Sequence, residues 1–118
     1  MTPNDETRLK HMIEAAEKAM AFAHGKTRDD LDQDEVLCLA LVRLLEIVGE
    51  AANRVSPQLR AQHQDVPWAL IIGMRNRLIH GYDVIDPEIL WQTLRQDLHP
   101  LISNLQTILS TNGLSESP

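Results

Sequence analysis

Apolar residues recur every three or four positions through most of this chain, and that period favours helices over strands. The segment from about Asp34 to Val55 shows the pattern most fully. Its main stripe consists of Val36, Ala40, Leu41, Leu44, Ile47, Val48, Ala51 and Val55. A neighbouring stripe consists of Cys38, Val42, Leu45, Gly49 and Ala52. Two stripes make a wider apolar arc than one neighbour covers, so we expect burial on two sides, by further helices or by a second subunit.

Helix start and stop signals divide the chain into four long helices. The predicted helices run from about Thr2 to Gly25, from Asp34 to Val55, from Pro67 to Gly81, and from Asp86 onward with a bend at Pro100. Lys26–Asp34 is an irregular link or a short helical turn, and Ser56-Pro57 opens a short helix. No segment shows a β pattern. We predict an all-α, up-and-down bundle of four to five helices over residues 1–110, with a disordered tail at 111–118.

The size and charge of the chain limit its partners. A chain of 118 residues suits one domain. Its net charge of −6 argues against a protein that coats nucleic acid with a broad surface, because phosphate binding needs a basic face. Any RNA contact must therefore be local. The single Cys38 and the lack of a long apolar run predict a cytoplasmic protein without a membrane span. The histidines show no pairing typical of a metal site, and we expect neither metal nor cofactor.

The third predicted helix carries an unusual arginine. On a helical wheel of ~100° per residue, Arg75 falls inside the apolar arc, between Ile71 and Ile79. A guanidinium there needs a carboxylate partner or a polar opening, because a desolvated charge is costly. Glu46 and Glu50 are possible partners.

Beside that arc, Gly73, Asn76, Arg77 and His80 form a polar strip. Asn76 and His80 are four positions apart and share one helix face. Arg75 and His80 lie about 140° apart on an ideal helix, so something else must complete the site. A symmetric dimer would bring these side chains into one cleft.

These residue types suit cleavage of a phosphodiester. Histidine exchanges protons near neutral pH, and arginine grips a phosphate by two hydrogen bonds. His80 would take a proton from a ribose 2′-hydroxyl or protonate the leaving oxygen, while Arg75 stabilises the charge on phosphorus. Asn76 would orient the imidazole or the phosphate, and Arg77 would bind RNA.

Residues 75–82, Arg-Asn-Arg-Leu-Ile-His-Gly-Tyr, resemble the Arg-x4-His-x-Tyr signature of the HepT-like branch of the HEPN superfamily. Leu44–Ala52 and Pro67–Met74 also resemble blocks of that branch. The resemblance implies a HEPN-like helical domain that forms a symmetric homodimer. It further implies a metal-independent endoribonuclease toxin whose site lies at the dimer interface and whose substrate is tRNA or mRNA. The implied partner is a minimal nucleotidyltransferase antitoxin that adenylylates Tyr82, placing a phosphate and a nucleoside near His80.

Two other interpretations stay open. The chain could be a non-catalytic HEPN helical module that docks a nucleotidyltransferase partner. It could also be a structural dimerisation bundle. In that case Arg77 and His80 are cations at a helix C-terminus, Gly81 is its left-handed cap, and Arg75 pairs with a glutamate of the second helix.

Overall fold

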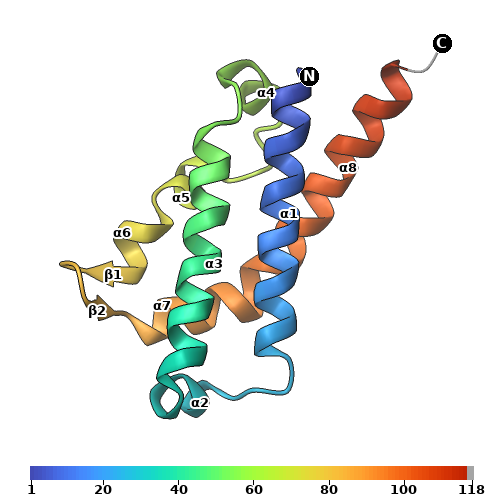
Figure 1. The fold of residues 1–118 in the computed structure, drawn as a ribbon. Coiled ribbons are helices and arrows are strands. Elements are labelled where there is room, and N and C mark those ends of the chain that lie inside the picture. Colours follow the sequence, from blue (N-terminus) through green and yellow to red (C-terminus); the bar gives the residue numbers. More distant parts are fainter. Residues whose placement is uncertain (117–118) are drawn as a thin grey trace.

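The computed structural model describes residues 1–116, and helices account for most of them. In chain order the elements are α1 (Pro3–Ala23), α2 (Arg28–Gln33), α3 (Glu35–Asn53), α4 (Pro57–Gln62), α5 (Trp68–Ile72), α6 (Met74–Leu78), β1 (Ile79–His80), β2 (Val84–Ile85), α7 (Pro87–Gln92), the π-helical turn η1 (Thr93–Asp97) and α8 (Leu98–Glu116). Figure 1 shows their course from the N-terminus to the C-terminus. The predicted all-α fold class is confirmed, and the polar link after α1 contains the short helix α2. No helix within residues 1–116 combines the length and hydropathy that crossing a bilayer would require.

The helices begin where the sequence places side-chain caps. The Thr2 Oγ1 accepts the N–H of Asp5 at the start of α1, and the Asp34 carboxylate accepts that of Leu37 at the start of α3. Ser56 and Asp86 cap α4 and α7 in the same way. Each cap satisfies N–H groups that have no partner within the helix, which sets the start of the element.

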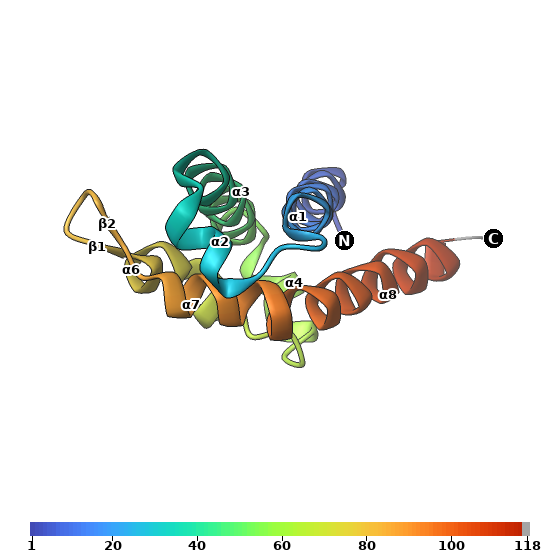
Figure 2. The ribbon, with the colours of Figure 1, turned by 90° about the horizontal axis from the view of Figure 1, so that it is seen from below.

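The helices form two layers. α1 and α3 lie side by side (Figure 1), and the view along them shows α6, α7 and α8 extending across beneath the pair (Figure 2). α3 packs against α1 on one side and against α5 and α6 on another, while α8 contacts α1. α7, η1 and α8 therefore form a second layer, which covers one side of the hydrophobic core between α1 and α3.

Both apolar stripes of α3 are largely buried within this one chain. In the second stripe, Leu45 and Ala52 are fully buried and Cys38 is only 8% exposed. Further helices thus cover the wide arc, which leaves this second stripe unavailable to a second subunit. The prediction was wrong for Val36 at the first turn of α3, which is 78% exposed.

Gly49 allows α3 and α5 to approach closely. A Cβ built on Gly49 would lie 2.9 Å from the backbone oxygen of Ile71, closer than real Cβ atoms come. We expect Gly49→Ala to lower the free energy of unfolding by about 1–3 kcal/mol, because the backbones must separate. Asn53→Ala, an exposed change on the same helix, should alter it by less than about 0.5 kcal/mol. Urea denaturation of both variants measures the difference, and equal stability would contradict the close approach.

The last helical segment contains the irregularity that Pro100 predicts. Pro100 has no N–H to donate to the carbonyl of Gln96, and the turn just before it is π-helical, with the N–H of Leu98 bonded to Thr93 O. The predicted stripe of this segment faces the core, with Leu90, Leu98 and Leu105 fully buried. For the predicted disordered tail, residues 111–116 continue α8, and residues 117–118 lie outside the described part.

The third predicted long helix is the main error of the sequence-based account. The structure interrupts it at Gly73 and ends it at Leu78, and the next residues form the hairpin β1–β2. Ile79 and His80 are therefore extended, and a helical wheel does not describe where His80 points. The predicted shared face of Asn76 and His80 is wrong for the same reason.

Candidate active site

The hairpin β1–β2 positions His80. Ile79 pairs with Ile85, and His80 pairs with Val84, in antiparallel register. Ile79 and Ile85 are half-buried and pack against the core, whereas His80 and Val84 are exposed. Because side chains alternate between the faces of a strand, burying the two isoleucines turns His80 outward. Gly81 follows with a φ of 75°, which confirms a left-handed glycine there, although it sits in a hairpin turn.

Asp86 holds the imidazole of His80. The Nε2 of His80 lies 3.2 Å from Oδ2 of Asp86, and the N–H of Asp86 donates to Leu78 O at 2.7 Å. Asp86 is two residues beyond Val84, so its side chain leaves the hairpin on the same face as that of His80. The other carboxylate oxygen, Oδ1, accepts the N–H groups of Glu88 and Ile89 at the start of α7.

The Asp86 carboxylate is ionised at neutral pH. The N–H of Ile89 is the largest cause that lowers its pKa below the usual value, and the contact with His80 adds to the effect. An ionised carboxylate only accepts hydrogen bonds. The Nε2 of His80 must therefore be the donor in this pair.

The start of α7 is itself fixed to another part of the fold. The Nε of Arg28, in α2, lies 2.7 Å from Oε1 of Glu88, two residues beyond Asp86. The same guanidinium also bonds to Asp32 at 3.0 Å. The carboxylate that contacts His80 thus belongs to a helix start that is bonded to α2.

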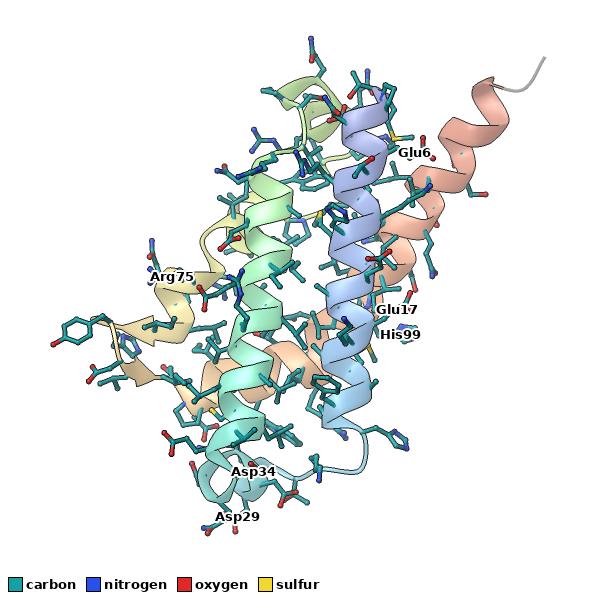
Figure 3. The ribbon with its side chains drawn as sticks, in the orientation of Figure 1. Glu6, Glu17, Asp29, Asp34, Arg75 and His99 are labelled. Atoms are coloured by element: carbon teal, nitrogen blue, oxygen red, sulfur yellow. The ribbon has the colours of Figure 1, made fainter. Side chains whose placement is uncertain are left out.

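Arg75 projects from α6 toward α3 (Figure 3). Its Nε lies 3.3 Å from Oε2 of Glu46, so the partner expected from the sequence is found. The expected burial is wrong, because the Arg75 side chain is 57% exposed. Exposed ion pairs contribute about 0–1 kcal/mol, so a phosphate can compete with Glu46 for the guanidinium.

Arg77 takes a different direction from Arg75. Its Nη2 donates to Leu70 O at 3.0 Å, and its Nε is buried without a hydrogen-bond partner. It lines a cavity of about 260 Å³ whose other walls include Met74, Asp97 and Leu98. Residues two apart on a helix point to nearly opposite sides, so Arg77 is not grouped with Arg75. RNA binding by Arg77 stays a prediction.

The two remaining motif residues are exposed. Asn76 lies on the surface of α6, next to Arg75. Tyr82 is in the turn of the hairpin and is 90% exposed. Figures 1 and 2 show this hairpin projecting from the body of the molecule. The Tyr82 hydroxyl is accordingly open to a modifying enzyme.

The chemistry of these groups is acid–base and electrostatic. The imidazole of His80 can accept or donate a proton, and the positively charged guanidinium of Arg75 can form two hydrogen bonds with a phosphate. Each of these two side chains contacts one carboxylate, Asp86 for His80 and Glu46 for Arg75. Among the described residues, no group of three or more His, Cys, Asp or Glu side chains could hold a metal ion.

Asp86 was not predicted to be a site residue. Asp86-Pro87 was expected only to start a helix, because a continuous helix through Gly81 would carry His80 away from Asp86. The available signal was Gly81 between the β-branched Ile79 and the pair Val84-Ile85, a spacing typical of a short hairpin. With that hairpin, His80 and Asp86 become diagonal neighbours.

Comparison with known proteins places the chain among ribonucleases. A family model described as "Ribonuclease HepT-like" matches residues 12–108. This range includes α3, the hairpin, and all of the candidate site residues described in this section.

Individual relatives span nearly the same length. The chain is 36% identical over 101 residues to "Putative RNase TTE0752" of Caldanaerobacter subterraneus subsp. tengcongensis, covering 86% of this chain and 90% of that protein. It is 32% identical over 93 residues to "Probable ribonuclease HepT" of Thermococcus cleftensis, covering 79% and 84%. It is 28% identical over 100 residues to "Putative RNase MJ1380" of Methanocaldococcus jannaschii, covering 85% and 92%. No solved structure matches the chain at a significant level.

Proposed function

The chain belongs to the HepT-like ribonuclease family, and we propose that it is the toxin of a toxin–antitoxin pair that cleaves RNA without a metal ion. The observation that carries the proposal is that Arg75 and His80 lie exposed on neighbouring elements. Arg75 and His80 are each held by a carboxylate, yet both are open to solvent and to a large substrate.

The proposed reaction forms one bond and breaks another at phosphorus. An imidazole takes the proton of a ribose 2′-hydroxyl, and the 2′-oxygen attacks the adjacent phosphorus. The bond from phosphorus to the 5′-oxygen breaks, and an imidazolium returns a proton to that oxygen. Arg75 stabilises the negative charge that develops on the phosphoryl oxygens, and Asn76 orients the phosphate. The products are a 2′,3′-cyclic phosphate and a 5′-hydroxyl.

We propose that two copies of the chain complete the site. A symmetric dimer brings two His80 and two Arg75 groups to one cleft, so that one imidazole acts as base and the other as acid. The exposed Val36 and Leu39 on α3 and Val84 on the hairpin are apolar residues available for such a contact. We propose these residues for the dimer contact in place of the second α3 stripe, because other helices of the same chain cover that stripe.

Tyr82 is the proposed regulatory residue. Its exposed position in the hairpin turn suits adenylylation by a nucleotidyltransferase antitoxin. AMP on the Tyr82 hydroxyl would place negative charge two residues from His80 and repel the RNA phosphate. The exposed hairpin would equally suit a non-catalytic docking module, in which case the complex forms but no RNA is cut.

Incubation of purified protein with tRNA or mRNA in the presence of EDTA tests the nuclease proposal. We expect cleavage to cyclic phosphate and 5′-hydroxyl ends. Co-expression with the nucleotidyltransferase should add the mass of one AMP to the tryptic peptide with Tyr82 and abolish cleavage. Tyr82→Phe protein should stay unmodified under co-expression. Intact RNA with a stable nucleotidyltransferase complex would instead favour the docking module.

A further inference from the structure

We infer that Asp86 is a positioning residue that fixes the proton of the neutral His80 ring on Nε2, so that Nδ1 is the atom that exchanges protons with RNA. This inference rests on the proposed ribonuclease function and adds to it the reactive atom of the imidazole. It follows from three features of the hairpin and of the start of α7.

The first feature is that the two carboxylate oxygens of Asp86 have different hydrogen-bond partners. Oδ1 accepts the N–H groups of Glu88 at 3.1 Å and Ile89 at 3.2 Å. Oδ2 is left for the Nε2 of His80 at 3.2 Å. Since the helix amides orient Oδ1, they also orient Oδ2 toward the imidazole.

The second feature is the charge of Asp86. Its hydrogen bonds with the Ile89 N–H and with His80 lower its pKa, so the group carries no proton at neutral pH. The proton between Asp86 and His80 must then lie on Nε2. A neutral imidazole has one proton, which leaves Nδ1 with a free lone pair.

The third feature is the exposure of His80. Its side chain is 60% exposed, while that of Asp86 is 28% exposed. The contact therefore covers one edge of the ring and leaves the other open to a substrate. In the reaction, Nδ1 takes the proton of the 2′-hydroxyl, and a ring protonated on both nitrogens gives the Nδ1 proton to the leaving oxygen. Asp86 accepts throughout and needs no proton transfer of its own.

The test substitutes Asp86 by residues that keep the helix cap. Asn and Ser cap helices about as well as Asp, so Asp86→Asn and Asp86→Ser should retain α7. In Asp86→Asn the side-chain oxygen caps α7 and the NH₂ faces His80, which moves the imidazole proton to Nδ1. In Asp86→Ser the shorter side chain caps α7 without reaching the ring. Asp34→Asn is the matched control, because Asp34 caps α3 at Leu37 and lies away from Arg75 (Figure 3).

Nitrogen NMR of histidine-labelled protein gives a readout that needs no substrate. The His80 signal is assigned by its absence from His80→Ala. We expect Nε2-protonated His80 in wild type and in Asp34→Asn, Nδ1-protonated His80 in Asp86→Asn, and a mixture in Asp86→Ser. Wild-type His80 with its proton on Nδ1, or an unchanged tautomer in Asp86→Asn, would overturn the inference.

Cleavage kinetics provide the second readout. Asp86→Asn should lower kcat by about 10²–10⁴-fold with little change in KM, since the substrate still binds but the base is protonated. A changed tautomer with unchanged kcat would overturn the positioning role. Wild type that cleaves no RNA would overturn the proposed function instead, and the NMR result would still decide which nitrogen Asp86 holds.

Discussion

His80→Ala protein should lose RNA cleavage by about 10²–10⁴-fold, the range that a positioned general acid or base contributes. The loss should appear in kcat, because the imidazole acts on protons that move only in the transition state. Steady-state cleavage of a labelled RNA measures it. In cells, expression of wild type should arrest growth and degrade RNA, whereas expression of His80→Ala should do neither.

The fold should tolerate this change. His80 is exposed, and its contact with Asp86 is a surface interaction. His99→Ala is a suitable control, because His99 is also exposed and lies on α8, far from Arg75 (Figure 3). Equal cleavage by His80→Ala, His99→Ala and wild type would remove His80 from the mechanism.

Arg75→Ala should reduce kcat/KM by about 10²–10³-fold, the usual cost of removing one group that stabilises charge in the transition state. Arg75→Lys should recover only part of the loss, since lysine is a point charge without the planar fork. Stability should change by no more than about 1 kcal/mol, because the pair with Glu46 is exposed. Cleavage assays and urea denaturation of the same preparations separate the two effects.

A charge-matched control distinguishes a local role from a loss of net positive charge. Arg43 lies on α3, is 60% exposed and pairs with Glu50 at 3.3 Å. Arg43→Ala removes the same charge from a neighbouring element and should leave kcat/KM within a few-fold of wild type. Equal losses in Arg43→Ala and Arg75→Ala would mean that Arg75 contributes only to general attraction of RNA.

The long helices could be predicted from the sequence because their signals are local. The caps at Thr2, Asp34, Ser56 and Asp86 use side chains within a few residues of the amides they satisfy. The period of the apolar residues also identified most of the core correctly. The sequence left open what covers the second stripe of α3, because that depends on residues far away in the chain.

The segment around Arg75 and His80 was harder to predict because two periods compete there. Met74 and Leu78 follow the helical period, whereas Ile79 and Ile85 follow the period of a strand. The helical interpretation placed Arg75 in the apolar arc and missed Asp86. The identities of Arg75 and His80 as candidates did not depend on that error, because the motif fixes them by residue type and spacing.

Mixed dimers test the central claim, that Arg75 and His80 of two copies meet at one phosphate. Arg75→Ala and His80→Ala subunits, each strongly impaired alone, are given different tags, and the mixed dimer is isolated by both tags. The shared cleft of such a dimer keeps one intact Arg75 from one copy and one intact His80 from the other. We predict that the mixed dimer cleaves RNA faster than either parent but more slowly than wild type, because one of the two imidazoles is missing. A mixed dimer as inactive as its parents, or wild-type protein that is monomeric in solution and still cleaves RNA, would contradict the account.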